Sequence, residues 1–221
     1  MIKIGLTGGI GAGKSTVSSL FKERGFPVFN SDICAREAEK KENIQLGFKR
    51  IIDDNIFING ELDRERLRGI IFTDKDKLKQ VNQLITPYVK AKFEKFCLDN
   101  ESDHAACILE SAILFETDAA KNFDYIITVT ASENTRIQRV LKRDGISVEM
   151  VLKKLGNQLP EVEKVSKSNF VVINDGYDIM DSLELLTRQV DAVVKAIKYD
   201  LLMKKVEDLE VALNDYKKIS E

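Results

Sequence analysis

A lysine and a serine close a glycine-rich stretch near the start of the chain, "GLTGGIGAGKST" at residues 5–16. Gly8, Gly13, Lys14 and Ser15 match the spacing G-x-x-x-x-G-K-[S/T]. In this pattern, amides at a helix N-terminus bind phosphate, the lysine reaches the β and γ oxygens, and the hydroxyl binds Mg²⁺. We therefore predict a nucleotide phosphate loop rather than a flexible structural turn. The residues predicted to bind nucleotide here are Gly11, Ala12, Gly13, Lys14, Ser15 and Thr16.

Acidic residues follow two later apolar runs. Asp32 comes after the run in "PVFNSD", at the C-terminal end of a predicted strand, where α/β sheets bind ligands. A kinase needs a carboxylate there to orient and deprotonate an acceptor hydroxyl; the alternative is that Asp32 caps a following helix. Glu110 ends "AACILE" and is predicted to support Mg²⁺. Glu116 is the alternative metal ligand, and a buried or capping carboxylate is the alternative for either glutamate.

Four basic residues recur at spacings of three to four in the helical segment 132–168. They are Arg136, Arg139, Lys142 and Arg143. On one face of a helix they form either a solvated surface or a clamp for phosphate charge.

Five short apolar runs predict the strands that position these residues. The runs lie at residues 2–6, 27–29, 105–109, 125–130 and 170–173. Helical patterns separate them, which is typical of a parallel sheet buried between helices. Residues 33–100 show only helical stretches, broken by a turn at 58–60, so we expect no strand there. Such an insert beside a phosphate loop usually shapes the pocket of the second substrate, and the chain after residue 176 reads as helix.

Composition limits the classes of protein that this chain can belong to. Its 221 residues, 43% of them apolar, suit one α/β domain with insertions. The formal net charge is −2, which gives no basic field for nucleic acid or an anionic membrane. No apolar run reaches membrane-spanning length, and the three cysteines lack zinc or disulfide spacing, so we expect a cytoplasmic protein.

Several motifs together resemble the dephospho-coenzyme A kinases. In order they are "LTGGIGAGKST", "VFNSDICARE", "GELDRERL", "ESAILFE", "RIQRVLKRD" and "VVINDG". The resemblance implies transfer of the ATP γ-phosphoryl group to the ribose 3′-hydroxyl of dephospho-coenzyme A, the last step of coenzyme A synthesis. It also implies a nucleoside-kinase-like core, a helical acceptor domain and a basic lid.

The resemblance assigns roles to individual residues. It implies that Asp32 activates the acceptor, that Arg64 in "LDR" binds it, and that Arg139 and Arg143 are lid residues. We take Arg139 as catalytic together with Lys14 and Asp32. Arg143 and Asn174, which lies in "VVINDG", complete the predicted nucleotide site.

This sequence departs from the family pattern at three places. Asn30 stands where the family often has an aspartate, Glu110 where it often has an aspartate followed by proline, and Thr86 where it often has histidine. Asn30 still forms hydrogen bonds and Glu110 keeps its charge, so the chemistry stays possible. Thr86 leaves the acceptor contacts of its region open.

The predicted fold is a three-layer P-loop domain of the α/β class with a parallel five-stranded sheet. We expect it to span residues 1–200, with an acceptor insert at about 33–100 and a lid at about 133–168. Residues 201–221 form a helical extension whose apolar stripe could pair with a second copy. Two functional alternatives are a kinase for another small hydroxyl or nucleotide acceptor and a nucleotide-dependent switch.

Overall fold

The computed structural model describes residues 1–176 and 179–220, and the side chains of residues 1–176 and 183–211. The chain divides into two compact units, residues 1–175 and 176–221. The first unit contains every residue predicted to take part in catalysis or binding.

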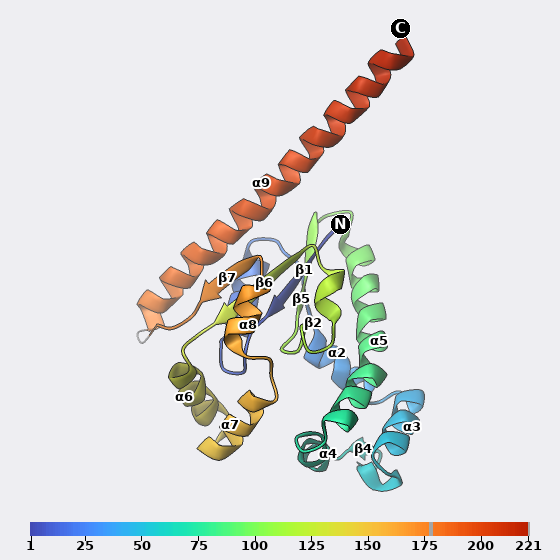
Figure 1. The fold of residues 1–221 in the computed structure, drawn as a ribbon, viewed down its shortest axis with the longest axis vertical. Helices are drawn as coiled ribbons and strands as arrows, with labels where there is room; N and C mark the ends of the chain where they lie inside the picture. Colours follow the sequence, from blue (N-terminus) through green and yellow to red (C-terminus); the bar gives the residue numbers. More distant parts are fainter. Residues whose placement is uncertain (177–178, 221) are drawn as a thin grey trace. The chain divides into compact units, whose positions relative to one another are not determined.

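A parallel five-stranded sheet forms the centre of the first unit (Figure 1). Its strands are β1 (Ile2–Thr7), β2 (Val28–Asn30), β5 (Ala106–Glu110), β6 (Tyr125–Thr130) and β7 (Phe170–Ile173). Their order is β2-β5-β1-β6-β7, and every neighbouring pair is parallel. This confirms the predicted fold class, and each strand falls on one of the five apolar runs.

The strand register brings the ends of three strands together. Glu110 lies opposite Leu6 on one side and opposite Asn30 on the other. The phosphate loop that follows β1 therefore leaves the sheet at the same edge as Asn30 and Glu110. Since ligands of open α/β sheets bind at the carboxyl ends of the strands, this edge is the expected site.

Both faces of the sheet are buried, as a run of consecutive apolar residues requires. On one face, Cys107 and Leu109 pack with Phe93, which lies on a long helix of the insert. Residues on the opposite face, such as Ile108 and Ile127, are fully buried too.

Helices make up most of the remaining first unit. They are α1 (Lys14–Glu23), α2 (Ser31–Ala38), α3 (Glu42–Ile51), α4 (Arg64–Ile71), α5 (Lys75–Asn100), α6 (Glu133–Asp144), α7 (Val148–Gly156) and α8 (Glu161–Ser166), with two 3₁₀ turns, η1 (Asp54–Ile56) and η2 (Ala119–Asn122). The helices α2 to α5 occupy the predicted insert, and α6 to α8 occupy the predicted lid segment.

A small hairpin inside the insert corrects the prediction that residues 33–100 contain no strand. It pairs β3 (Phe57–Ile58) with β4 (Glu61–Leu62) in antiparallel register. The turn between them, Asn59-Gly60, has φ values of 51° and 82°. Two residues per strand are too few to produce an alternating pattern, although the Asn-Gly pair is a typical hairpin turn. The insert has its own apolar cluster, which includes Phe48, Ile56 and Leu62.

The second unit consists mainly of one helix, α9 (Ile179–Ser220). Among its described side chains, Leu186, Val190 and Ile197 are buried, whereas Leu202 and Leu209 are 59% and 69% exposed. No described helix combines the length and the apolar character that a bilayer span requires.

Candidate active site

The phosphate loop joins β1 to α1 in a conformation that only glycine tolerates. Gly8 has φ 149° and Gly13 has φ 90°. A Cβ atom on Gly8 would lie 2.1 Å from the carbonyl oxygen of Val129, and one on Gly13 would lie 2.1 Å from Nδ2 of Asn174. Glycine is therefore required at these positions for two reasons: it adopts the backbone conformation of the turn, and it lets the loop pack closely against β6 and Asn174.

Lys14 begins α1 and folds back over the loop. Its Nζ donates hydrogen bonds to the carbonyl oxygens of Gly8, at 3.0 Å, and Gly9, at 3.4 Å. Burial lowers the pKa of Lys14, while the negative charges of Asp32 and Glu110 oppose that shift. The ammonium group is thus a desolvated cation at the loop that the charges of Asp32 on α2 and Glu110 at the end of β5 stabilise.

Asp32 lies in the first turn of α2 and is exposed. The helix cap is Asn30, whose Oδ1 accepts a hydrogen bond from the amide of Ile33 at 3.0 Å. Capping by Asp32, the alternative considered from sequence, is therefore wrong. Because Asn30 makes the capping bond, the Asp32 carboxylate stays available to a ligand.

Glu110 and Glu116 have different surroundings. Glu110 ends β5, and its Oε2 accepts from Ser18 Oγ at 2.7 Å and from Asn30 Nδ2 at 3.5 Å. Glu116 instead forms an ion pair with Lys164, with 3.0 Å between Oε1 and Nζ. The pairing neutralises Glu116, so Glu110 is the better candidate to support a metal.

Arg139 on α6 reaches the phosphate loop through Asn174. Its Nη1 donates to the backbone oxygen of Asn174 at 2.9 Å, and its Nη2 donates to the Asn174 side-chain oxygen at 3.3 Å. Asn174 in turn donates from Nδ2 to the carbonyl oxygen of Ala12 at 2.8 Å. The structure therefore brings three predicted residues from distant parts of the chain into one contact chain.

Two other predicted residues lie apart from that chain. Arg143 is mostly exposed and donates from Nε to Asp144 at 2.7 Å. That hydrogen bond lowers the pKa of Asp144 to about 2. Arg64 begins α4, and its guanidinium bonds to Glu39 Oε2 through Nε at 3.0 Å and Nη2 at 2.5 Å.

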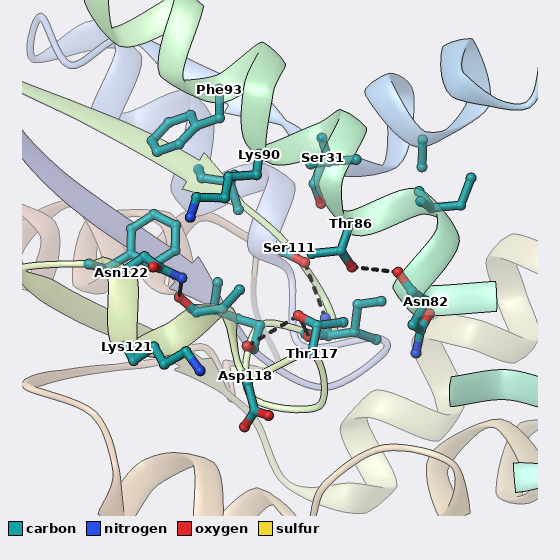
Figure 2. Close-up of a pocket in the computed structure, with 18 of the residues that line it drawn as sticks. Ser31, Asn82, Thr86, Lys90, Phe93, Ser111, Thr117, Asp118, Lys121 and Asn122 are labelled. Atoms are coloured by element: carbon teal, nitrogen blue, oxygen red, sulfur yellow. Dashed lines mark hydrogen bonds between the residues drawn. The ribbon is translucent and has the colours of Figure 1, made fainter. Parts of the chain in front are cut away.

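The first unit contains two cavities that border the helical insert. The smaller, of about 210 Å³, is lined by Asp32 together with residues of α5 and of the segment after β5 (Figure 2). The larger, of about 740 Å³, lies between α5 and the loop after α7 and has three lysines in its wall, Lys75, Lys79 and Lys90. Thr86 borders both cavities, while its hydroxyl donates to the carbonyl oxygen of Asn82 at 2.6 Å.

Sequence reasoning named Arg136 without a role of its own and did not identify Lys164 or Gln158, two other buried or half-buried polar residues of the predicted lid segment. Arg136 is 7% exposed and pairs with Glu161 at 3.4 Å, and Lys164 is fully buried. Gln158 contacts the phosphate loop at Ile10. The partners of these residues lie far away along the chain, so the sequence gives no local pattern that predicts their contacts. The basic character of the helix that contains Arg136 is the one feature that marked this segment.

The family model and the two relatives named below carry the same description. A family model described as dephospho-CoA kinase matches residues 2–179. A dephospho-CoA kinase of Bacteroides fragilis is 35% identical over 180 residues, covering 79% of this chain and 85% of that protein. One from Arabidopsis thaliana is 34% identical over 203 residues, covering 90% and 84%. The crystal structure of TT1252 from Thermus thermophilus is 32% identical, with a TM-score of 0.70, covering 90% of this chain and 97% of that one.

Proposed function

Because the chain belongs to the dephospho-CoA kinase family, we propose that it transfers the γ-phosphoryl group of ATP to the ribose 3′-hydroxyl of dephospho-coenzyme A. The products are coenzyme A and ADP. The enzyme is an ATP-dependent phosphotransferase of coenzyme A biosynthesis. The roles of individual residues below are our proposals.

One observation gives the main support for the proposed residue roles. Asp32 lines the smaller cavity and is also close enough to Lys14 for its charge to affect the pKa of that lysine. A carboxylate that faces both a cavity and a phosphate-loop cation suits a base between acceptor and nucleotide. We therefore assign Asp32 as the residue that orients the acceptor hydroxyl and takes up its proton.

The nucleotide is proposed to bind along the phosphate loop. Backbone amides of residues 11–16 and the Lys14 ammonium take the phosphate oxygens, supported by the positive end of the α1 dipole. Arg139 and Asn174, already in contact with the loop, then face the transferring group. Arg143 would join them only after leaving Asp144.

Mg²⁺ is proposed as the second cofactor. Ser15 and Glu110 supply oxygen donors, which is the ligand type that Mg²⁺ prefers, and the ion keeps several waters in such sites. Bound Mg²⁺ would neutralise phosphate charge during transfer. The hydrogen bond from Ser18 to Glu110 would hold that carboxylate in place.

Acceptor binding is proposed to use Asp32, which lines the smaller cavity, and Arg64 at the start of α4, which lines neither cavity. The lysine-lined wall of the larger cavity suits the phosphate charges of the acceptor. Arg64 now bonds to Glu39, so we expect it to exchange that partner for the acceptor. We further propose a cytoplasmic location and pairing of α9 with a second copy.

Replacing Asp32 by Asn tests the central assignment. We expect kcat to fall by about 10² to 10⁴-fold, because the variant keeps the shape but loses the base. The assay is ADP release with dephospho-coenzyme A and, for comparison, with other alcohols and nucleotides. Glu37→Gln, an exposed carboxylate on the same helix, is the matched control. An Asp32→Asn enzyme with full specific activity but a lower Tm would show that the role is structural.

A further inference from the structure

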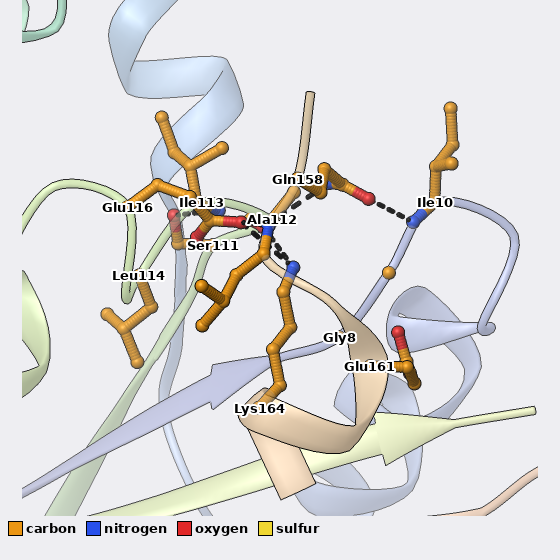
Figure 3. Close-up of polar contacts among 12 residues, drawn as sticks. Gly8, Ile10, Ser111, Ala112, Ile113, Leu114, Glu116, Gln158, Glu161 and Lys164 are labelled. Atoms are coloured by element: carbon orange, nitrogen blue, oxygen red, sulfur yellow. Dashed lines mark hydrogen bonds and ion pairs between the residues drawn. The ribbon is translucent and has the colours of Figure 1, made fainter. Parts of the chain in front are cut away.

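A fully buried lysine anchors the lid segment to the chain that follows β5. Lys164 lies on α8 with no exposed surface, and its Nζ is 3.0 Å from Glu116 Oε1 and 3.4 Å from the carbonyl oxygen of Ala112 (Figure 3). A buried charge costs free energy unless it is paired and hydrogen-bonded. Both partners here come from residues 111–117, which we name the wall segment.

Gln158 joins the same wall segment to the phosphate loop. Its Oε1 accepts a hydrogen bond from the amide of Ile10 at 2.8 Å, and its Nε2 donates to the Ala112 carbonyl oxygen at 3.4 Å. Figure 3 shows the side chain lying between these two residues. One amide group therefore bridges the nucleotide loop and the wall segment.

A second contact packs α6 and α8 against the phosphate loop. Glu161 forms an ion pair with Arg136, and this pair lies directly over Gly9, where a Cβ atom would be 2.6 Å from Arg136 Nη1 and 2.7 Å from Glu161 Oε2. Leu159 donates its amide to Glu116 Oε1 at 2.8 Å. Residues 158–164 thus contact the phosphate loop on one side and the wall segment on the other.

The wall segment borders both cavities assigned to the acceptor. Ser111, Leu114 and Thr117 line the smaller cavity, and Glu116 and Thr117 line the larger one. A shift of the phosphate loop at Ile10 would therefore move a wall of the acceptor site through Gln158. Burial lowers the pKa of Lys14, and the charge of Lys164 adds to that lowering, so the anchor also acts electrostatically on the phosphate site.

We infer that Gln158 and Lys164 are positioning residues that couple nucleotide binding to acceptor binding, so that each substrate increases the affinity for the other. This inference rests on the proposed function. By thermodynamic linkage, the factor must be equal in both directions. Typical coupling factors are about 5 to 150-fold.

The test compares dissociation constants measured by calorimetry. Dephospho-coenzyme A is titrated into the full-length protein with and without a saturating, non-hydrolysable ATP analogue and Mg²⁺. For the unmodified protein we expect the analogue to lower the Kd of the acceptor by about fivefold or more. The reverse titration should give the same factor.

Gln158→Glu is the sharpest variant, because its carboxylate can still accept from Ile10 but cannot donate to Ala112. We expect the coupling factor to fall to about one, while thermal stability stays close to that of the unmodified protein. Lys164→Arg keeps the buried cation and should retain coupling better than Lys164→Met. Lys167→Met is the control, since Lys167 is an exposed lysine at the C-cap of α8 that pairs only with Glu163 among the described residues.

The binding measurements distinguish coupling from direct contact with the acceptor, and both from a failure of the proposed function. A Gln158→Glu protein that binds the acceptor more weakly by the same factor with and without the analogue would show direct contact and overturn the coupling. An unmodified protein with equal acceptor affinity in both conditions would also overturn it, yet leave the proposed function intact. An unmodified protein that binds no dephospho-coenzyme A in either condition would instead contradict the proposed function itself.

Discussion

Lys14 shows, at the scale of a single residue, how burial prepares the phosphate loop for its ligand. Its pKa is lowered chiefly because burial disfavours the ammonium form. Phosphate oxygens favour that form and raise the pKa again. ATP binding should therefore take up a proton at alkaline pH, and affinity should fall as pH rises through the lowered pKa of the free enzyme.

We expect this loss of affinity in calorimetric titrations with MgATP from about pH 7 to about pH 10. Arginine stays charged throughout this range, so Lys14→Arg should lack the alkaline decrease even if its affinity at neutral pH is lower. An identical alkaline decrease in Lys14→Arg would assign it to a different group.

Glu110 gives a second prediction at this scale. Glu110→Gln keeps the hydrogen bond with Ser18 possible but removes the charge, so we expect a higher Mg²⁺ concentration for half-maximal activity. The measurement is a Mg²⁺ titration at saturating substrates. Glu116→Gln is not a neutral control, because it leaves Lys164 unpaired. An unchanged titration for Glu110→Gln would remove Glu110 from the metal site.

At the scale of elements, α6 carries Arg139, which is linked to the phosphate loop through Asn174. Arg139→Ala removes both hydrogen bonds to Asn174 and the positive charge that we propose to face the transferring group. Arginines in comparable positions contribute up to about 10³ to 10⁵-fold to kcat, so we expect a large fall in kcat. Gln138→Ala, an exposed change on the same helix, is the control. A normal kcat with a higher KM for ATP would mean that Arg139 only binds.

Elements with a strong local signal were predictable from the sequence. The strands β1, β5 and β6 have buried residues on both faces, so they appear as mainly apolar runs, and the phosphate loop combines glycines with Lys14 in a fixed spacing. The β3–β4 hairpin was missed because its strands have two residues each.

Residues whose role depends on distant partners were not predictable. Gln158 meets Ile10 across 148 positions, and Lys164 meets Ala112 across 52. The capping role of Asn30 could not be separated from Asp32, since both are good N-cap residues and only the end of β2 decides between them.

At the scale of the whole molecule, we expect the end of α9 to pair with a second copy. Leu202, Val206 and Leu209 are exposed on the described part of this helix, by 59%, 39% and 69%. Exposed apolar residues at spacings of three and four are typical of a helix that pairs with another. The segment is short for a coiled coil, so we expect a concentration-dependent dimer.

Truncation after Lys205 should lower the molar mass measured by light scattering while kinase activity is retained. Replacing Val206 and Leu209 together by glutamate in the full chain should have the same effect without changing its length. An unchanged molar mass in both variants would reject pairing through α9.

The position of β1 in the sheet has a consequence for the protein while it is being synthesised. This strand is synthesised before its two neighbours, β5 and β6, which follow about a hundred residues later. At translation rates of about 5–20 residues per second, β1 waits roughly 5 to 20 s with both edges unpaired. Unpaired edges invite association with other chains. Asn174, which closes the phosphate loop, is made later still, so ATP can stabilise the nascent chain only after the first unit is almost complete.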